Sequence, residues 1–433
     1  MKRWRTRSAV WRGLAATVLA AALLAGGIYQ ARTESSPVAG TLSPAGLKRL
    51  GDIVRKEIAN SKIPGAILLL QQHGKLLTFE CFGMRDPDTG QPMTKDTIFP
   101  IHSMSKAVTS VAAMMLVDEG KLALDDPVSQ YIRSFADTKV GVDISDETGK
   151  RPLKLEPLKR PLTIRDLLRH TSGMTYGFYG ESQVQKLYAD PLLYAGDFDN
   201  AEFADRIAIM PLADQPATRW NYGHSTDVLG RVVEVASGQT LYQFEKQRLF
   251  DPLGMPNTAY YVADQAKWPL IAKTFLARRF SVAGIRDPTV ARRWESGGAG
   301  LVSTAADYAR FLQMLLNGGE LDGKRYLKRE TVALMTSDQI GPETGIIHDP
   351  FYFPGDTSGF GLGFAVRTSP PPGTTWPLGE YRWSGAAGSF YFVDPVDDMF
   401  GIFMVMAPTE AGRIQLDLKT TMYEAMGKGL RKD

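Results

Sequence analysis

The sequence has little of the chemistry on which disulfide-linked and metal-dependent proteins rely. Its 433 residues include one cysteine, Cys81, so no disulfide can form within the chain. Cys81 lies in the apolar stretch LLTFECFG, where we expect a small buried side chain rather than a reactive thiol. The five histidines have no ligand spacing such as H-E-x-x-H, and no P-loop or dinucleotide motif occurs. No metal and no cofactor are therefore predicted.

The chain also lacks a basic stripe. Its 50 Lys and Arg residues nearly balance 47 Asp and Glu residues, and five of the basic ones lie within residues 1–31, which contain no acidic residue. The remainder is close to neutral, whereas nucleic-acid binding needs a concentrated basic surface. We expect no nucleic-acid partner.

The basic N-terminus precedes an apolar run from Gly13 to Ile28, which is short for a membrane span. Residues 1–31 therefore favour a signal peptide, with an uncleaved N-terminal anchor as the alternative. No cysteine follows the run, which excludes a lipoprotein anchor. Either way we expect an exported protein, periplasmic or secreted, that meets the membrane only through this segment. Residues 32–42 are polar and read as a linker.

The periodicity of residues 43–433 predicts one α/β domain of the α+β type. Strands are expected on both sides of His73-Gly74 and again over 381–407, with a mostly helical and loop region inserted at about 121–295. The simplest architecture joins the N- and C-terminal strands in one antiparallel sheet flanked by helices, with a site in the cleft. The main helices are expected at 44–60, 103–120, 305–319 and 413–427.

Ser103-Met104-Ser105-Lys106 opens one of these helices. Positions i and i+3 share a helix face, so the Lys106 amine can approach the Ser103 hydroxyl. Serine is a weak nucleophile that needs such a neighbour, and the N–H groups of a helix start can help to bind an oxyanion. Taken alone, an S-x-x-K pattern is close to chance.

Two further patterns lie downstream. Tyr222 precedes a predicted helix, and beside a cationic lysine its phenol could act as a base; the plainer alternative is a packed tyrosine. Trp383-Ser384-Gly385-Ala386 lies in the C-terminal strand region. Small residues at a strand edge let a backbone N–H face a substrate carbonyl. The alternative is an ordinary strand followed by a glycine turn, which would have the same sequence pattern.

The order and spacing of the three patterns resemble the serine β-lactamase and penicillin-binding superfamily. Within it, the chain is most similar to the class C β-lactamase-like branch and to the family VIII carboxylesterases, over roughly residues 43–430. Further stretches agree in order: FGMRD, LTIRDLLRHTSGM, YGHSTDVLGRVVEVASGQTL, GGAGLVSTAADYARF and GLGFAV. The resemblance implies a β-lactamase/transpeptidase-like fold.

The resemblance also implies roles. Ser103 would be the acylated nucleophile, and Lys106 and Tyr222 would take its proton and pass it to the leaving group. The backbone N–H groups of Ser103 and Ala386 would form the oxyanion hole. The residues expected at the substrate are His224, Trp383, Ser384 and Gly385.

Two departures from the β-lactamase pattern shift the expected substrate. His224 replaces the asparagine of Tyr-x-Asn, and Trp383 replaces the lysine that helps to hold the carboxylate of penicillins and peptides. A neutral tryptophan cannot replace that charge, and W-x-G is similar to the family VIII esterases. We therefore predict a serine hydrolase acting on short-chain esters. A β-lactamase, a D-alanyl-D-alanine carboxypeptidase and a non-hydrolytic penicillin sensor remain as alternatives.

One competing pattern is weaker. Gly223-His224-Ser225-Thr226-Asp227 partly matches the G-x-S-x-G elbow of α/β-hydrolases, but Asp227 replaces the second glycine and no apolar strand precedes it. His102 and His170 are expected to be structural, with the His170 ring bonded to loop backbone.

Overall fold

The computed structural model describes residues 40–144, 152–275, 287–348 and 351–429. The predicted leader at 1–31 and most of the 32–42 linker lie outside the described residues. Within the part that is described, no helix is both long and apolar enough to cross a membrane.

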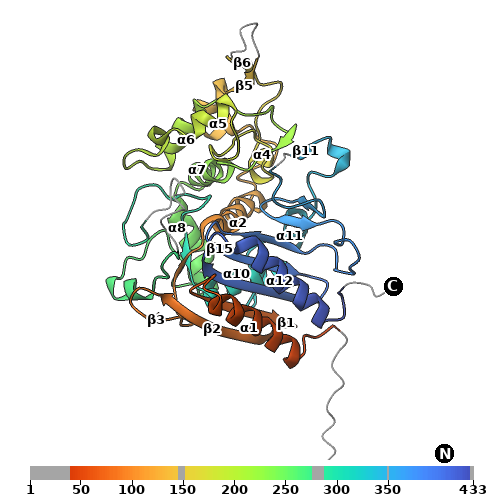
Figure 1. The fold of residues 1–433 in the computed structure, drawn as a ribbon. Helices are drawn as coiled ribbons and strands as arrows, with labels where there is room; N and C mark the ends of the chain where they lie inside the picture. Colours follow the sequence, from red (N-terminus) through yellow and green to blue (C-terminus); the bar gives the residue numbers. More distant parts are fainter. Residues whose placement is uncertain (1–39, 145–151, 276–286, 349–350, 430–433) are drawn as a thin grey trace, which may run out of the picture. The chain divides into compact units, whose positions relative to one another are not determined.

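One antiparallel sheet of eight strands forms the base of the fold (Figure 1). Its fifth and sixth strands join the two ends of the sequence, since Ala66 of β1 (Gly65–Gln72) lies opposite Val405 of β16 (Met399–Met406). The predicted sheet of N- and C-terminal strands is therefore confirmed. In spatial order the strands are β12 (Ser358–Phe360), β13 (Ala365–Arg367), β14 (Tyr381–Ser384), β15 (Gly388–Asp394), β16 (Met399–Met406), β1 (Gly65–Gln72), β2 (Lys75–Asp86) and β3 (Gln91–Pro92).

Helices cover both faces of this sheet because its central strands are apolar on both sides. Side chains alternate along a strand. Ile67 and Leu69 of β1 accordingly enter the larger core, while Leu68 and Leu70 enter the smaller one. The smaller core is closed by α1 (Pro44–Ala59) and α12 (Ala411–Ala425), and the larger one contains α2 (Ser105–Asp118) and α10 (Ala305–Leu316).

Short helices and the loops between them make up most of the described chain between α2 and residue 295, as Figure 1 shows in yellow and green. Sequence analysis missed one antiparallel strand pair there, formed by β5 (Lys139–Asp143) and β6 (Leu153–Pro157), because β6 has no buried residue and β5 buries only Val140 and Gly141. The helices are α3 (Val128–Tyr131), α4 (Ile164–Leu168), α5 (Gln183–Tyr188), α6 (Asn200–Ala208), α7 (Ser225–Ser237), α8 (Leu241–Glu245) and α9 (Asp251–Leu253), with α11 (Arg329–Met335) further on.

Two local expectations need correction. Cys81 is half-buried rather than buried, because it lies on β2 near the edge of the sheet. Burial still raises the pKa of its thiol. The His170 ring packs against the Trp220, Tyr222 and Phe360 rings, and its buried Nδ1 has no hydrogen-bond partner among the described residues.

Candidate active site

Ser103 lies at the junction between the sheet and the helical region. The chain passes through β4 (Phe99–Pro100), which pairs with β8 (Val302–Ser303), and then forms a 3-10 turn, His102–Met104, that leads into α2. His102 has φ +47°, in the left-handed region that non-glycine residues rarely adopt. Burial lowers the pKa of its imidazole to about 4, so the residue before Ser103 is neutral at pH 7.

Lys106 lies one turn along, and its amine reaches the serine as the S-x-x-K spacing predicts. Its side chain is 2% exposed, and Nζ lies 3.4 Å from Ser103 Oγ. Nζ also donates to the Tyr176 hydroxyl over 3.2 Å and to the Gly298 carbonyl over 2.8 Å. These three acceptors match the three N–H groups of an ammonium ion.

Tyr222 packs beside Lys106. The ammonium lies over its ring, 4.6 Å from the centroid. The Tyr222 hydroxyl oxygen accepts a hydrogen bond from the Trp383 indole, with a length of 3.1 Å. The second and third sequence patterns therefore meet at one phenol oxygen.

The third pattern comes next to Ser103 because of Gly385. A Cβ at this position would lie 2.5 Å from the Ile101 carbonyl oxygen, so only glycine lets the end of β14 approach the serine turn this closely. Ala386 follows, is exposed, and lines the same cavity as Ser103. Its backbone N–H makes no hydrogen bond within the described part of the chain, which leaves it available to a substrate oxygen.

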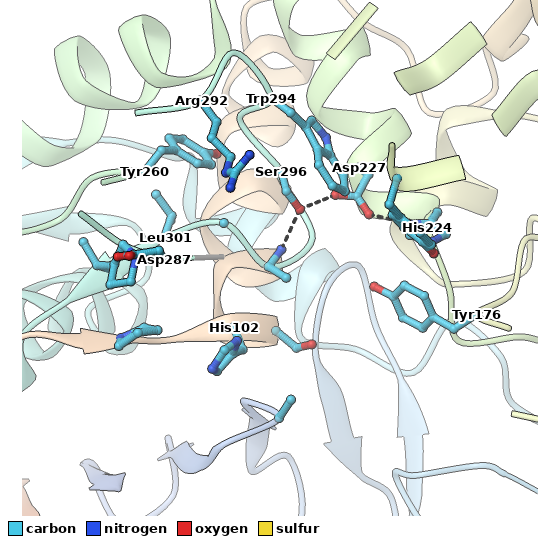
Figure 2. Close-up of a pocket in the computed structure, with 18 of the residues that line it drawn as sticks. His102, Tyr176, His224, Asp227, Tyr260, Asp287, Arg292, Trp294, Ser296 and Leu301 are labelled. Carbon is cyan, nitrogen blue, oxygen red and sulfur yellow. Dashed lines mark hydrogen bonds and ion pairs between the residues drawn. The ribbon is translucent and has the colours of Figure 1, made fainter. Parts of the chain in front are cut away.

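The cleft has two lobes that meet at Ser103. Ser103, Tyr179, Tyr222 and Ala386 line both of them. The large lobe has a volume of about 500 Å³ and the small lobe about 220 Å³. Figure 2 shows part of the large-lobe wall, and its aromatic members are Tyr176, Phe178, Tyr179, Tyr194, Tyr222, Tyr260 and Trp294. The small lobe is lined by Phe353, Arg382, Trp383, Ser384 and Gly385, among others.

Comparison with known proteins identifies the family. Residues 50–423 match the family model described as Beta-lactamase. The chain belongs to the beta-lactamase family. Protein Rv1367c of Mycobacterium tuberculosis is 38% identical over 79% of this chain and 86% of its own length. Esterase EstB of Burkholderia gladioli is 30% identical over 89% of this chain and 98% of its own. The structure of EstCE1, a hydrolase with promiscuous acyltransferase activity, aligns with a TM-score of 0.73 at 25% identity, over 88% and 98% of the two chains.

Within this family the chain is a serine hydrolase, and its similarity to EstB and EstCE1 supports a place in the EstB-like branch. Both the predicted fold class and the predicted resemblance are confirmed. The structure also places the competing elbow serine, Ser225, fully inside the protein, where its hydroxyl bonds to that of Ser172 over 2.7 Å. Ser103, by contrast, is partly exposed in the cleft.

The family's Tyr-x-Asn asparagine position holds His224, which is 3% exposed in the wall of the large lobe. Its two ring nitrogens bond to the Tyr194 hydroxyl over 2.9 Å and to the Asp227 carboxylate over 2.8 Å. That His224 contacts the substrate stays a prediction.

Sequence analysis missed three residues around Lys106, namely Tyr176, Gly298 and Asp227. Tyr176 follows the HTSG segment in an aromatic, glycine-containing loop, and this composition was the one available signal. Gly298 acts through its carbonyl oxygen, which no side-chain pattern can reveal. In the sequence, Asp227 stood out only because it replaces the second glycine of the G-x-S-x-G elbow of α/β-hydrolases.

Proposed function

We propose that this beta-lactamase-family chain is a carboxylesterase that cleaves small-molecule esters through an acyl-enzyme on Ser103. The observation that carries the proposal is the convergence of Lys106 Nζ, 3.4 Å from Ser103 Oγ, with a Tyr222 phenol that Trp383 holds by a hydrogen bond. A nucleophile, a proton acceptor and an oxyanion site then surround one point in the cleft.

The reaction would run in two halves. The Ser103 oxygen attacks the ester carbonyl carbon as its proton passes to the Lys106 and Tyr222 pair, and the N–H groups of Ser103 and Ala386 stabilise the oxyanion. The C–O bond to the alcohol then breaks, and the alcohol leaves with that proton. A water molecule next attacks the acyl-enzyme and gives its proton to the same pair. The C–O bond to Ser103 then breaks, the pair returns the proton to the Ser103 oxygen, and the acid leaves.

The charges near the small lobe favour an ester over a penicillin or a peptide. Trp383 is neutral, and Arg382, the adjacent cation, is already engaged. Its guanidinium donates to the Pro354 carbonyl and the Ser358 hydroxyl, each over 2.9 Å, and lies 3.5 Å from the Glu380 carboxylate. A substrate carboxylate here would have to compete with these internal acceptors.

The test uses protein lacking residues 1–31, assayed with p-nitrophenyl butyrate and with nitrocefin beside Ser103→Ala. We expect butyrate ester turnover that Ser103→Ala abolishes. Full ester turnover by Ser103→Ala would refute the nucleophile. Much faster turnover of nitrocefin would support the β-lactamase alternative, and stable labelling by a penicillin without turnover would support the sensor. Release of D-alanine from a D-alanyl-D-alanine peptide would support the carboxypeptidase.

We also propose that the protein is exported by its N-terminal segment, on the basis of the basic residues and the apolar run from Gly13 to Ile28. Fractionation of a Gram-negative host expressing the full chain tests this. Periplasmic or membrane-bound activity is the expected result, and activity confined to the cytoplasm would refute it.

A further inference from the structure

Asp227 is a buried carboxylate next to the cleft, and no step described above uses it. It lies in the first turn of α7 and is 4% exposed. One carboxylate oxygen accepts bonds from the Ser296 hydroxyl over 2.5 Å and the Gly298 N–H over 3.1 Å. The other bonds to His224 Nδ1 over 2.8 Å. Figure 2 shows Asp227 between Ser296 and His224, and all three residues line the large lobe.

The bond to Gly298 leads straight to the catalytic lysine. The Gly298 carbonyl oxygen accepts the 2.8 Å bond from Lys106 Nζ, so Asp227 and Lys106 hold the same residue through its N–H and its C=O. Gly298 has no room for a side chain, because a Cβ would lie 2.8 Å from the Asp227 carboxylate. This loop is therefore held against the lysine with little freedom.

A second path reaches Lys106 through His224. The His224 ring meets the Tyr176 ring edge-on, with centroids 4.5 Å apart, and the Tyr176 hydroxyl is the other neutral acceptor for Lys106. His224 is itself held between Asp227 and Tyr194. Residues that contact Asp227 thus position both the carbonyl and the phenol that orient the ammonium.

Asp227 also supplies charge. Burial alone would raise the pKa of this carboxyl, but the bond from His224 and the positive charge of Lys106 lower it below its usual value, so the group is ionised. Among the described residues, Lys106 forms no direct ion pair. The titratable groups whose charges interact with Asp227 are Lys106, His170, His224, Tyr176 and Tyr194.

We infer that Asp227, acting with His224, is a positioning residue that orients Lys106 and places a buried negative charge near it for acyl transfer at Ser103. The inference rests on the proposed function. A carboxylate that only ties α7 to the loop at 296–298 would support the fold, and its loss would leave kcat and the pH profile unchanged.

The deciding variant is Asp227→Asn in the protein lacking residues 1–31. We expect kcat for p-nitrophenyl butyrate to fall about ten- to a hundredfold, as small displacements of catalytic groups do, with KM within about threefold of wild type. Removing a buried anion lowers the pKa of any group that titrates beside it, so the kcat/KM pH profile should move to lower pH.

Ser296→Ala separates geometry from charge. It removes one bond to Asp227 but keeps the carboxylate, so kcat should fall by a smaller factor while the pH profile stays in place. This variant also keeps the inference testable if Asp227→Asn does not fold, since wild-type kcat in a folded Ser296→Ala protein would contradict it.

Asp307→Asn is the matched control. Asp307 is another buried carboxylate, 4% exposed, in the first turn of α10. It accepts from the Asn257 N–H over 2.7 Å and the Thr258 hydroxyl over 3.1 Å, and it lines neither lobe. Asp307→Asn should lower Tm without moving the pH profile.

An Asp227→Asn protein with reduced Tm but wild-type kcat and pH profile would overturn the inference while Ser103→Ala still abolished activity. Ester hydrolysis that survived Ser103→Ala would instead refute the proposed function itself.

Discussion

The Trp383 indole N–H donates a hydrogen bond to the Tyr222 hydroxyl oxygen over 3.1 Å. Trp383 therefore has a second effect, besides placing a neutral side chain where the β-lactamase pattern has a lysine. A donor aimed at a phenol oxygen stabilises that oxygen as it gains negative charge, and the Lys106 ammonium lies 4.6 Å from the centroid of the same ring. Under the proposed function, Trp383 would therefore both favour esters and prepare the proton acceptor.

Trp383→Phe should show this directly. The substitution keeps an apolar ring but removes the donor, and a hydrogen bond to a charged group contributes about 1.5–3 kcal/mol. We expect kcat for p-nitrophenyl butyrate to fall about tenfold or more with little change in KM. Steady-state kinetics measure it, with Trp376→Phe as control, because Trp376 is equally buried but packs in the smaller core away from the cleft. Equal effects of the two changes would argue against a role for the indole N–H.

The two phenols beside Lys106 should differ in importance. Tyr222→Phe is expected to lower kcat about a hundredfold or more if its phenol is the base. Burial raises the pKa of Tyr176 well above its usual value, so Tyr176 stays protonated and serves only as an acceptor for Lys106. Tyr176→Phe should therefore cost about tenfold, as the loss of one orienting bond. The same assay compares the two variants. A larger loss of kcat for Tyr176→Phe than for Tyr222→Phe would indicate that Tyr176 is the base and that Tyr222 only orients Lys106.

The parts of this site that were predictable are those set by local chain geometry. Ser103 lies in the 3-10 turn that leads into α2 and Lys106 lies three positions on, in the first turn of α2, and the i to i+3 rule anticipated their contact. The strand at Ile67 to Leu70 was equally predictable from the sequence. Its successive side chains enter the two cores in turn, so every residue is apolar and the strand appears as a continuous apolar run.

The parts that were missed depend on contacts between distant segments. Tyr176 meets Lys106 from 70 positions away, and Trp383 meets Tyr222 from 161 positions away. No periodicity encodes such pairings, because loop conformations decide them. The order of motifs supplied Trp383 and Tyr222 as members of one site, but their hydrogen bond became visible only in three dimensions.

A buried carboxyl near the large lobe should give the protein a distinct pH dependence of stability. Burial raises the pKa of Glu245 to about 8, and this side chain contacts the Thr109 and Tyr260 hydroxyls. The folded state therefore holds a proton that the unfolded chain loses near pH 4.5, so Glu245 makes stability fall as pH rises from about 4.5 to 8. Glu245→Gln should remove this dependence.

Thermal unfolding at pH 5 and pH 8 measures it. The Glu245→Gln variant should melt a few degrees above wild type at pH 8 and about equally at pH 5, because wild-type Glu245 is already neutral there. Glu330→Gln, an exposed carboxyl on α11, is the control and should change neither value. A constant difference between Glu245→Gln and wild type at both pH values would mean that Glu245 is not protonated in the fold.

The unequal lobes should make the enzyme sensitive to substrate size. The large lobe, at about 500 Å³ and lined by aromatic rings, can enclose a bulky apolar group such as a naphthyl ring. Ala299 lies exposed in its wall, so Ala299→Trp should fill part of the space. We expect kcat/KM for 1-naphthyl butyrate to fall about tenfold, in line with the loss of apolar contact, while p-nitrophenyl acetate stays within about twofold.

Ala266→Trp provides the comparison, because Ala266 is exposed but lines neither lobe. It should leave both substrates unchanged. A proportional loss for both esters in Ala299→Trp would indicate that the large lobe acts as a passage to Ser103 rather than as a binding site for the bulky group. Selective loss of the naphthyl ester would assign that group to the large lobe and leave the small lobe, with Trp383 in its wall, for the other side of the ester.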